Sequence, residues 1–208
     1  MLVKTVELKR LLKKAEMTSS DLLRTIWQHE GNIYSVIPKE SFIEVKWTEL
    51  EGAEYAVMSY QWLSQWGSIG DFILLSENRV LQPYMWIDAL CLDQLDPGKM
   101  MTIQRSDEIY FHAKAYHLME LGSLTRGWVL FELSSVKPSM LPPKIHLSKH
   151  DPASIDVTKQ FLRDKGFDGC EFTEESDRKV VRDKIILKYG TIDKFNLKIV
   201  EIVNHIFI

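Results

Sequence analysis

The runs YAVMSY at residues 55–60 and YMWID at residues 84–88 decide the fold class of this chain. Short apolar runs bounded by turn residues are typical of strands that are buried on both faces of a sheet. Two further runs, AYHLM at 115–119 and IHL at 145–147, fit the same description. The helical patterns that separate these runs lie at 67–79, 99–113 and 125–136. Strands that alternate with helices predict a parallel sheet flanked by helices, which is an α/β fold.

Both flanks of this region are predicted to be helical. Residues 2–30 read as two helices, and two or three more helices are predicted at about 153–165, 177–189 and 191–206. We expect a single domain over residues 1–208, with a core at about 50–150 and extra helices in extensions at 1–31 and 153–208. The lysines near the N-terminus are interpreted as a solvated helix face, with a membrane-surface helix as the alternative.

The composition excludes several classes of protein. The chain has 208 residues, a formal net charge of −3 and 45% hydrophobic residues, which argues against disorder and against a strongly basic nucleic-acid binder. Cys91 and Cys170 lie far apart, so neither a disulfide framework nor a zinc ribbon is expected. The sequence shows neither a signal-peptide pattern nor an apolar run of membrane-spanning length. We expect a cytoplasmic protein with no nucleic-acid partner and no membrane partner.

Polar side chains follow the first two predicted strands. Ser59 and Tyr60 end the first strand and are followed by Trp62, while Asp88 ends the second and is followed by Asp93. Ligands of open α/β sheets bind outside the carboxyl ends of the strands, so these residues are candidates for a binding site. The alternatives stay open, because Ser59 and Tyr60 could simply terminate a strand and Asp88 could cap the next helix.

The helix predicted at 125–136 carries a third polar group. Trp128 and Glu132 are four residues apart and therefore share one helix face, and Arg126 lies two residues before Trp128. A carboxylate beside an indole suits a ring that carries positive charge, although spacing alone also fits a solvated glutamate. The histidine spacings do not form a metal-ligand pattern, so no metal site is predicted.

Four blocks of the sequence carry a family resemblance. They are YAVMSYQW at 55–62, MWIDALCLDQ at 85–94, EIYFHA at 108–113 and TRGWVLFEL at 125–133. Together they resemble the heterokaryon-incompatibility (HET) domain of fungi, which is related to Toll/interleukin-1 receptor (TIR) domains. The chain departs from the HET pattern at Leu63, where the family has glycine, and at Asp93, where it has asparagine.

The resemblance implies a TIR-like, flavodoxin-like parallel sheet and an activity. In enzymatic TIR domains the glutamate of the W-x-x-x-E-L helix cleaves NAD⁺, which makes Glu132 the expected catalytic residue. The candidate substrate-binding residues around it are Ser59, Tyr60, Trp62, Asp88, Asp93, Arg126 and Trp128. NAD⁺ would be the substrate, with no resident cofactor and no metal, and the protein would act in defence, in cell death or as a toxin.

One carboxylate is chemically sufficient for this reaction. The nicotinamide of NAD⁺ already carries a positive charge and leaves as a neutral molecule, so no general acid is needed. A carboxylate that faces the oxocarbenium-like ribose would stabilise the transition state more than the ground state. Two alternatives remain: a non-catalytic module that signals by self-association or through an activating protein partner, and a domain that binds a nucleotide second messenger without turnover.

Overall fold

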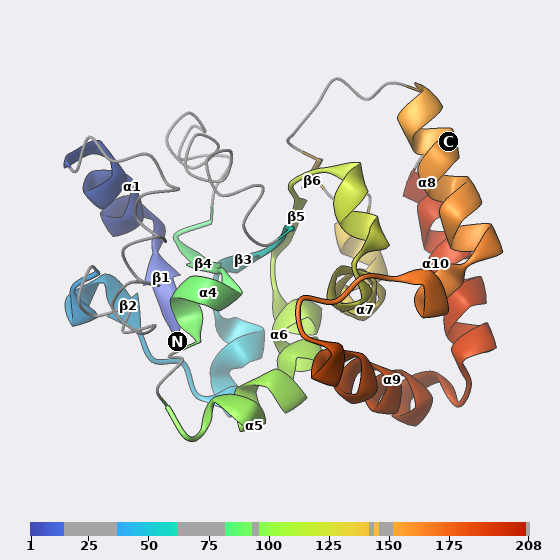
Figure 1. The fold of residues 1–208 in the computed structure, drawn as a ribbon. Helices are drawn as coiled ribbons and strands as arrows, with labels where there is room; N and C mark the ends of the chain where they lie inside the picture. Colours follow the sequence, from blue (N-terminus) through green and yellow to red (C-terminus); the bar gives the residue numbers. More distant parts are fainter. Residues whose placement is uncertain (15–36, 62–81, 93–95, 142–143, 146–151, 207–208) are drawn as a thin grey trace.

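The computed structural model of the chain describes residues 1–14, 37–61, 82–92, 96–141, 144–145 and 152–206 (Figure 1). Among these residues six strands form one mixed sheet in the order β2-β1-β4-β3-β5-β6. The strands are β1 (Leu2–Lys4), β2 (Phe42–Ile43), β3 (Tyr55–Ser59), β4 (Tyr84–Trp86), β5 (Ala115–Leu118) and β6 (Lys144–Ile145).

The predicted parallel strands form one half of this sheet. β3 pairs in parallel with both β4 and β5, and β5 pairs in parallel with β6. All five residues of β3 are buried, as expected for a central strand between two layers. The alternation of strands and helices therefore predicted the α/β class and these four strands correctly.

The N-terminal edge of the sheet corrects two expectations. β1 pairs antiparallel with β4 and with β2, so the sheet is mixed and not wholly parallel. The predicted helix from residue 2 begins as a strand at Leu2–Lys4, and α1 (Thr5–Lys14) follows it. The N-terminal extension thus supplies a strand that lies between β2 and β4 in the sheet. The second helix predicted within residues 2–30 and the helix predicted at 67–79 lie outside the described residues.

The C-terminal helices form close to their predicted positions. The helices after β4 are α4 (Asp88–Cys91), α5 (Lys99–Gln104), α6 (Ser106–His112), α7 (Gly127–Ser135), α8 (Pro152–Asp164), α9 (Glu175–Tyr189) and α10 (Ile192–Ile206). The single helix predicted at 99–113 is interrupted at Arg105, whose guanidinium stacks 4.0 Å from the Trp47 ring centroid and forms an ion pair with Glu108. These contacts hold Arg105 between α5 and α6.

Four of the helices pack against one another beside the central strands. α6 and α7 pack against each other, and α9 and α10 contact α7 in turn (Figure 1). Tyr55 of β3 donates a hydrogen bond to the Ile109 carbonyl of α6 at 2.6 Å, which fixes α6 over β3. Almost every side chain of α7 is buried or partly buried, as expected for a helix enclosed between a sheet and further helices.

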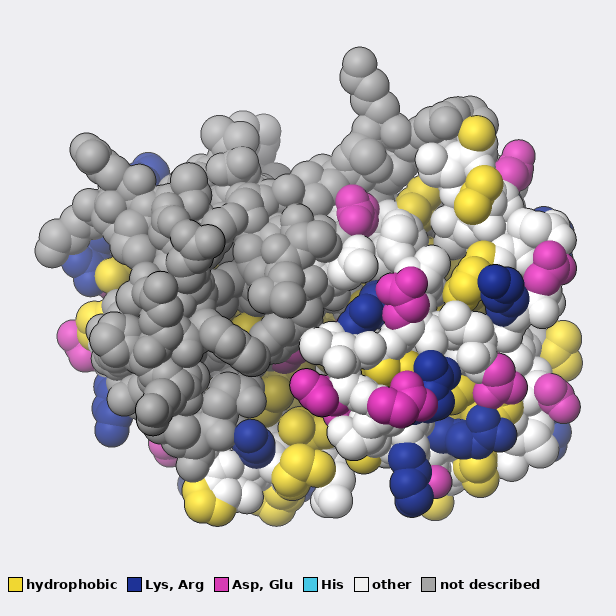
Figure 2. All heavy atoms as spheres, in the orientation of Figure 1, with side chains coloured by type: hydrophobic (Ala, Val, Ile, Leu, Met, Phe, Trp, Pro, Cys, Tyr) yellow, Lys and Arg dark blue, Asp and Glu magenta, His cyan; other side chains and the backbone are white. Residues whose placement is uncertain are grey.

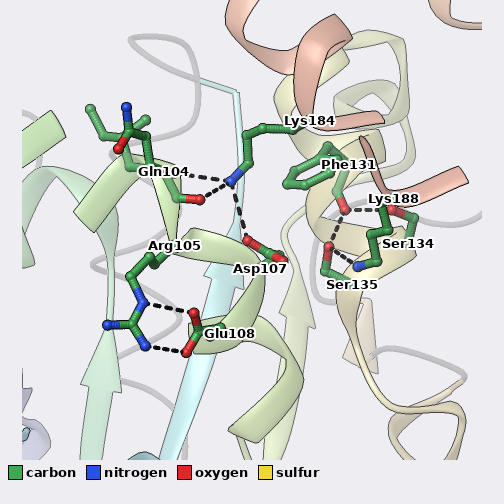
Figure 3. A network of polar contacts seen from close by, with 10 residues as sticks. Gln104, Arg105, Asp107, Glu108, Phe131, Ser134, Ser135, Lys184 and Lys188 are labelled. Carbon is green, nitrogen blue, oxygen red and sulfur yellow. Dashed lines mark hydrogen bonds and ion pairs between the residues drawn. The ribbon is translucent and has the colours of Figure 1, made fainter. Parts of the chain in front are cut away.

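Two lysines of α9 join the outer helices to the inner ones (Figure 3). Lys184 donates to the carbonyls of Ile103 and Gln104 at the end of α5, and its Nζ lies 3.2 Å from Asp107 of α6. Lys188 donates to Ser135 Oγ of α7 at 3.0 Å. Because a cation satisfies otherwise unpaired carbonyls at a helix C-terminus, Lys184 acts as a cap delivered by another helix.

A single cluster of buried apolar side chains extends from Leu2 of β1 to Val203 of α10. On the face shown in Figure 2, acidic and basic side chains are interspersed over the C-terminal helices and do not gather into a patch of one sign. None of the helices in the described ranges is both long enough and apolar enough to cross a membrane.

Candidate functional site

The carboxyl group of Glu132 lies at the carboxyl end of β3. Its Oε2 atom is 2.5 Å from the hydroxyl of Ser59, the last residue of that strand. Ser59 is 1% exposed, whereas Glu132 is only partly buried. The Glu132 side chain therefore reaches from a partly buried position on α7 to a buried hydroxyl. The contact brings together two of the predicted site residues, Glu132 and Ser59.

Two tyrosines complete the buried side of this site. The Tyr110 hydroxyl of α6 donates to the Met58 carbonyl at 3.3 Å and lies 3.5 Å from Ser59 Oγ. The Tyr116 hydroxyl of β5 is also buried and makes no hydrogen bond among the described residues. Sequence reasoning missed both tyrosines, because each lies inside an apolar run and reads as core.

The tyrosine rings belong to an aromatic row across the sheet. Trp86 and Tyr116 flank Val57 in the strand register, so their side chains lie on the same face. The Tyr110 ring meets both edge-on, with centroids 5.5 Å from Trp86 and 6.1 Å from Tyr116. This row forms an apolar floor beneath the polar end of the site, and it gives Trp86 the core role expected of its apolar run.

A second carboxylate lies at the end of the neighbouring strand. The Tyr60 hydroxyl donates to Asp88 Oδ1, which also accepts the backbone N–H of Ala89 at 2.7 Å. Asp88 is the first residue of α4, directly after β4. It therefore binds a backbone amide in the first turn of α4, and it also joins the ends of β3 and β4.

The environment of Glu132 favours its protonated form. Burial raises the pKa of Glu132 to about 8, the hydrogen bond from Ser59 opposes this rise, the charge of Asp88 adds to it, and Tyr110 opposes it. Burial also raises the pKa of Tyr60, and Asp88 and Glu132 both contribute to that rise. The charge of Asp88 therefore acts directly on Glu132, and both carboxyl groups also act on Tyr60.

The helix that carries Glu132 places the other two predicted residues elsewhere. Arg126 donates to Thr173 Oγ1 at 2.5 Å and lies 3.6 Å from Glu171, so its contacts are with the C-terminal segment. Trp128 is partly buried against the core, with its ring centroid 6.5 Å from that of Phe131. The structure therefore brings Ser59, Tyr60, Asp88 and Glu132 together, but not the guanidinium of Arg126. Trp62 and Asp93 lie outside the described residues.

The strand order places the carboxyl end of β3 where α/β sheets usually bind their ligands. In chain order the parallel strands begin with β3, continue to β4 on one side of it, and then pass to β5 on its other side. The change of direction falls between β3 and β5, and ligands of open α/β sheets bind at such a switch point, outside the carboxyl ends of the strands. Ser59 ends β3 at this point, and Glu132 comes from the helix that follows β5.

The described residues offer little support for metal or thiol chemistry. No group of three or more His, Cys, Asp or Glu side chains among them could hold a metal ion. Cys91 and Cys170 are both buried, and burial raises the pKa of the Cys91 thiol to about 11 and that of Cys170 to about 12. Neither thiol would be ionised near neutral pH, so neither is an activated nucleophile.

No family model matches this chain, and neither the curated proteins nor the solved structures contain a match to it.

Proposed function

We propose that the chain is a TIR-like NAD⁺ glycohydrolase in which Glu132 is the catalytic residue. The products would be nicotinamide and either ADP-ribose or a cyclic form of it. The observation that carries this proposal is the Glu132 carboxyl, placed 2.5 Å from Ser59 Oγ at the switch point of the sheet.

The strand order supports the finer fold assignment. Numbered along the chain, the four parallel strands β3, β4, β5 and β6 have the spatial order 2-1-3-4. This is the beginning of the flavodoxin-like order 2-1-3-4-5, to which the TIR-like expectation belongs. The antiparallel strands β1 and β2 would then be an addition at the edge next to β4.

The protonated state of Glu132 fits a cationic substrate. Burial raises the pKa of Glu132 to about 8, so most molecules of the free protein carry a neutral carboxyl at pH 7. A positive ring in contact with the carboxyl favours its ionised form. The carboxylate would then oppose the charge that moves from nicotinamide to the ribose as the bond breaks.

The neighbouring residues take roles that their positions support. Asp88 and Tyr60 border the same sheet end and would hold ribose hydroxyls or the carboxamide. Trp128, Trp62 and Asp93 remain predicted contributors to substrate binding. Arg126 would act indirectly, because its ion pair with Glu171 anchors the beginning of α7.

The test is nicotinamide release from NAD⁺ by concentrated protein, with products identified by mass. Glu132→Gln keeps the size of the side chain and removes its charge, and we expect it to lower kcat about 10²–10³-fold, as loss of a preorganised electrostatic group does. Glu201→Gln is the matched control, because Glu201 is 70% exposed on α10. Wild-type protein that leaves NAD⁺ intact, or equal rates for the two variants, would contradict the proposal.

A self-associating module is the second candidate, and the exposed apolar side chains favour it. Leu187 on α9 is 89% exposed and Leu197 on α10 is 72% exposed. If these residues mediate association, aspartate at either position would abolish oligomers in sedimentation, while Glu132→Gln would leave them intact. A cytoplasmic role in defence, cell death or toxicity is compatible with either function, and a second-messenger receptor would bind the nucleotide without releasing nicotinamide.

A further inference from the structure

Four features of the Glu132 environment make an ionised carboxylate unfavourable there. The carboxyl is partly buried, it contacts the hydroxyl of Ser59, a second carboxylate lies nearby at Asp88, and an aromatic row lies beneath it. An ionised carboxylate in such a place is costly unless a positive charge accompanies it.

The hydrogen bonds around Ser59 give an ionised carboxylate little compensation. Ser59 Oγ donates to Glu132 Oε2 at 2.5 Å, and the Tyr110 hydroxyl donates to the Met58 carbonyl at 3.3 Å. Ser59 is a neutral donor, and a neutral donor offsets only part of the cost of burying a carboxylate, which favours the neutral form in the free protein.

We propose that Glu132 exchanges a proton for an organic cation: the carboxyl keeps its proton in the free protein, and a bound cationic ring displaces that proton to solvent. In the exchange the O–H bond of the carboxyl breaks, the carboxylate keeps the electron pair, and buffer takes the proton. The inference rests on the proposed function, because it takes the Glu132 site as the place where the cationic ring binds. The ligand class is an aromatic cation such as a pyridinium.

The groups that face Glu132 determine the strength of this coupling. Tyr60 at the end of β3, Asp88 of α4, Tyr110 of α6 and Tyr116 of β5 interact with it. From α9, Lys184 and Lys188 lie over the ring of Phe131, the residue before Glu132. α10, which also contacts α7, is buried through apolar side chains.

Asp88 and Ser59 act on the exchange in opposite directions. The negative charge of Asp88 raises the pKa of Glu132, and the hydrogen bond from Ser59 lowers it. Asp88→Asn should therefore ionise Glu132 at a lower pH and reduce the coupling near neutrality. Ser59→Ala should delay ionisation and extend the coupling to higher pH. Asp88 is thus a positioning residue that keeps the site protonated until a cation arrives.

The experiment is titration calorimetry with the N-methylnicotinamide cation, which has no glycosidic bond to cleave, in two buffers of different ionisation enthalpy. With a pKa of about 8 for Glu132, we expect about 0.9 protons released per bound cation at pH 7 and about 0.1 at pH 9. The affinity should rise about tenfold between these pH values, because only the ionised fraction binds. Neutral nicotinamide should release no proton.

The variants make the result decisive. Glu132→Gln should bind the cation more weakly than wild type at pH 9, and any binding that remains should release no proton. Asp88→Asn should release fewer protons than wild type at pH 7, and Ser59→Ala should release more at pH 9. Binding to the wild type without proton release, proton release that survives in Glu132→Gln, or no binding of the cation would overturn the inference. Nicotinamide release from NAD⁺ is measured separately, so proton-coupled binding without turnover contradicts only the proposed function, and turnover without proton coupling contradicts only this inference.

Discussion

Glu132 makes the stability of the folded chain depend on pH. Burial raises its pKa to about 8 in the folded chain, against about 4.3 in an unfolded peptide. The folded state therefore binds this proton more tightly, and the stability that the neutral carboxyl contributes is complete below about pH 4 and is lost as pH rises to about 8. The loss should be on the order of a few kcal/mol.

Urea unfolding of wild type and Glu132→Gln at several pH values measures this contribution. The variant carries no ionisable group at this position. Its free energy of unfolding minus that of wild type should therefore increase from pH 5 to pH 8 and stay constant above pH 8. Glu201→Gln controls for the loss of a surface charge, because Glu201 is 70% exposed. A difference between wild type and Glu132→Gln that does not change with pH would show that the carboxyl is ionised in the folded chain.

The sequence predicted some residues of the site and not others, for a physical reason. Ser59, Asp88 and Glu132 are polar residues at strand ends or on a short helix, where an apolar pattern makes them conspicuous. Tyr110 and Tyr116 are hidden by that same pattern, since a tyrosine can bury its ring and still direct a hydroxyl at the site. Sequence spacing predicts which residues lie near Glu132 along α7, but it does not predict where the guanidinium of a long side chain such as Arg126 finds its partner. Arg126 is therefore a site residue in the prediction but not in the structure.

At the scale of elements, the beginning of α7 is packed too closely for any side chain at Gly127. A Cβ atom there would lie 2.0 Å from the Phe172 ring. That ring is itself confined, with its centroid 5.7 Å from Phe167 and the Arg178 guanidinium 4.8 Å from it. The backbones are joined at the same point, because Gly127 N–H donates to the Glu171 carbonyl at 3.2 Å.

Gly127→Ala should therefore destabilise the fold by about 1–3 kcal/mol, as overpacking does. Gly52→Ala is the matched control, since a Cβ atom at Gly52 would meet nothing within 4 Å, and it should be neutral or slightly stabilising. Thermal unfolding of the three proteins measures both effects. Equal melting temperatures for Gly127→Ala and wild type would mean that the segment around Phe172 is not held against α7.

Elements were predictable from sequence where local pattern and tertiary role agree. β3 is a continuous apolar run, α9 ends at Gly190 and α10 has apolar residues at helical spacing, and all three form within a few residues of their predicted bounds. β1 and β2 are only three and two residues long, and their pairing partners lie far away in the sequence. A strand that exists because a sheet edge is available leaves no periodicity of its own, so residues 2–4 read as the start of a helix.

At the scale of the whole molecule, the C-terminal helices share the core of the sheet. Phe195 of α10 is 0% exposed, and its ring centroid lies 6.1 Å from Phe167 and 5.4 Å from Tyr189. Tyr189 in turn donates to the Ser134 carbonyl of α7 at 2.9 Å. The apolar side chains of α10 are thus connected through α9 to the helix that carries Glu132, and the two parts should unfold together.

Tryptophan fluorescence provides a direct test, because all six tryptophans lie between Trp27 and Trp128 and none lies in α8, α9 or α10. Phe195→Ala should lower the free energy of unfolding by about 3–5 kcal/mol. If unfolding is cooperative, that loss should be visible in the fluorescence transition, at the same urea concentration as the helical circular dichroism signal. Leu197→Ala is the control on the same helix, since Leu197 is 72% exposed, and it should change stability by about 0.5 kcal/mol or less. A dichroism transition that moves in Phe195→Ala while the fluorescence transition stays in place would mean that the C-terminal helices unfold on their own.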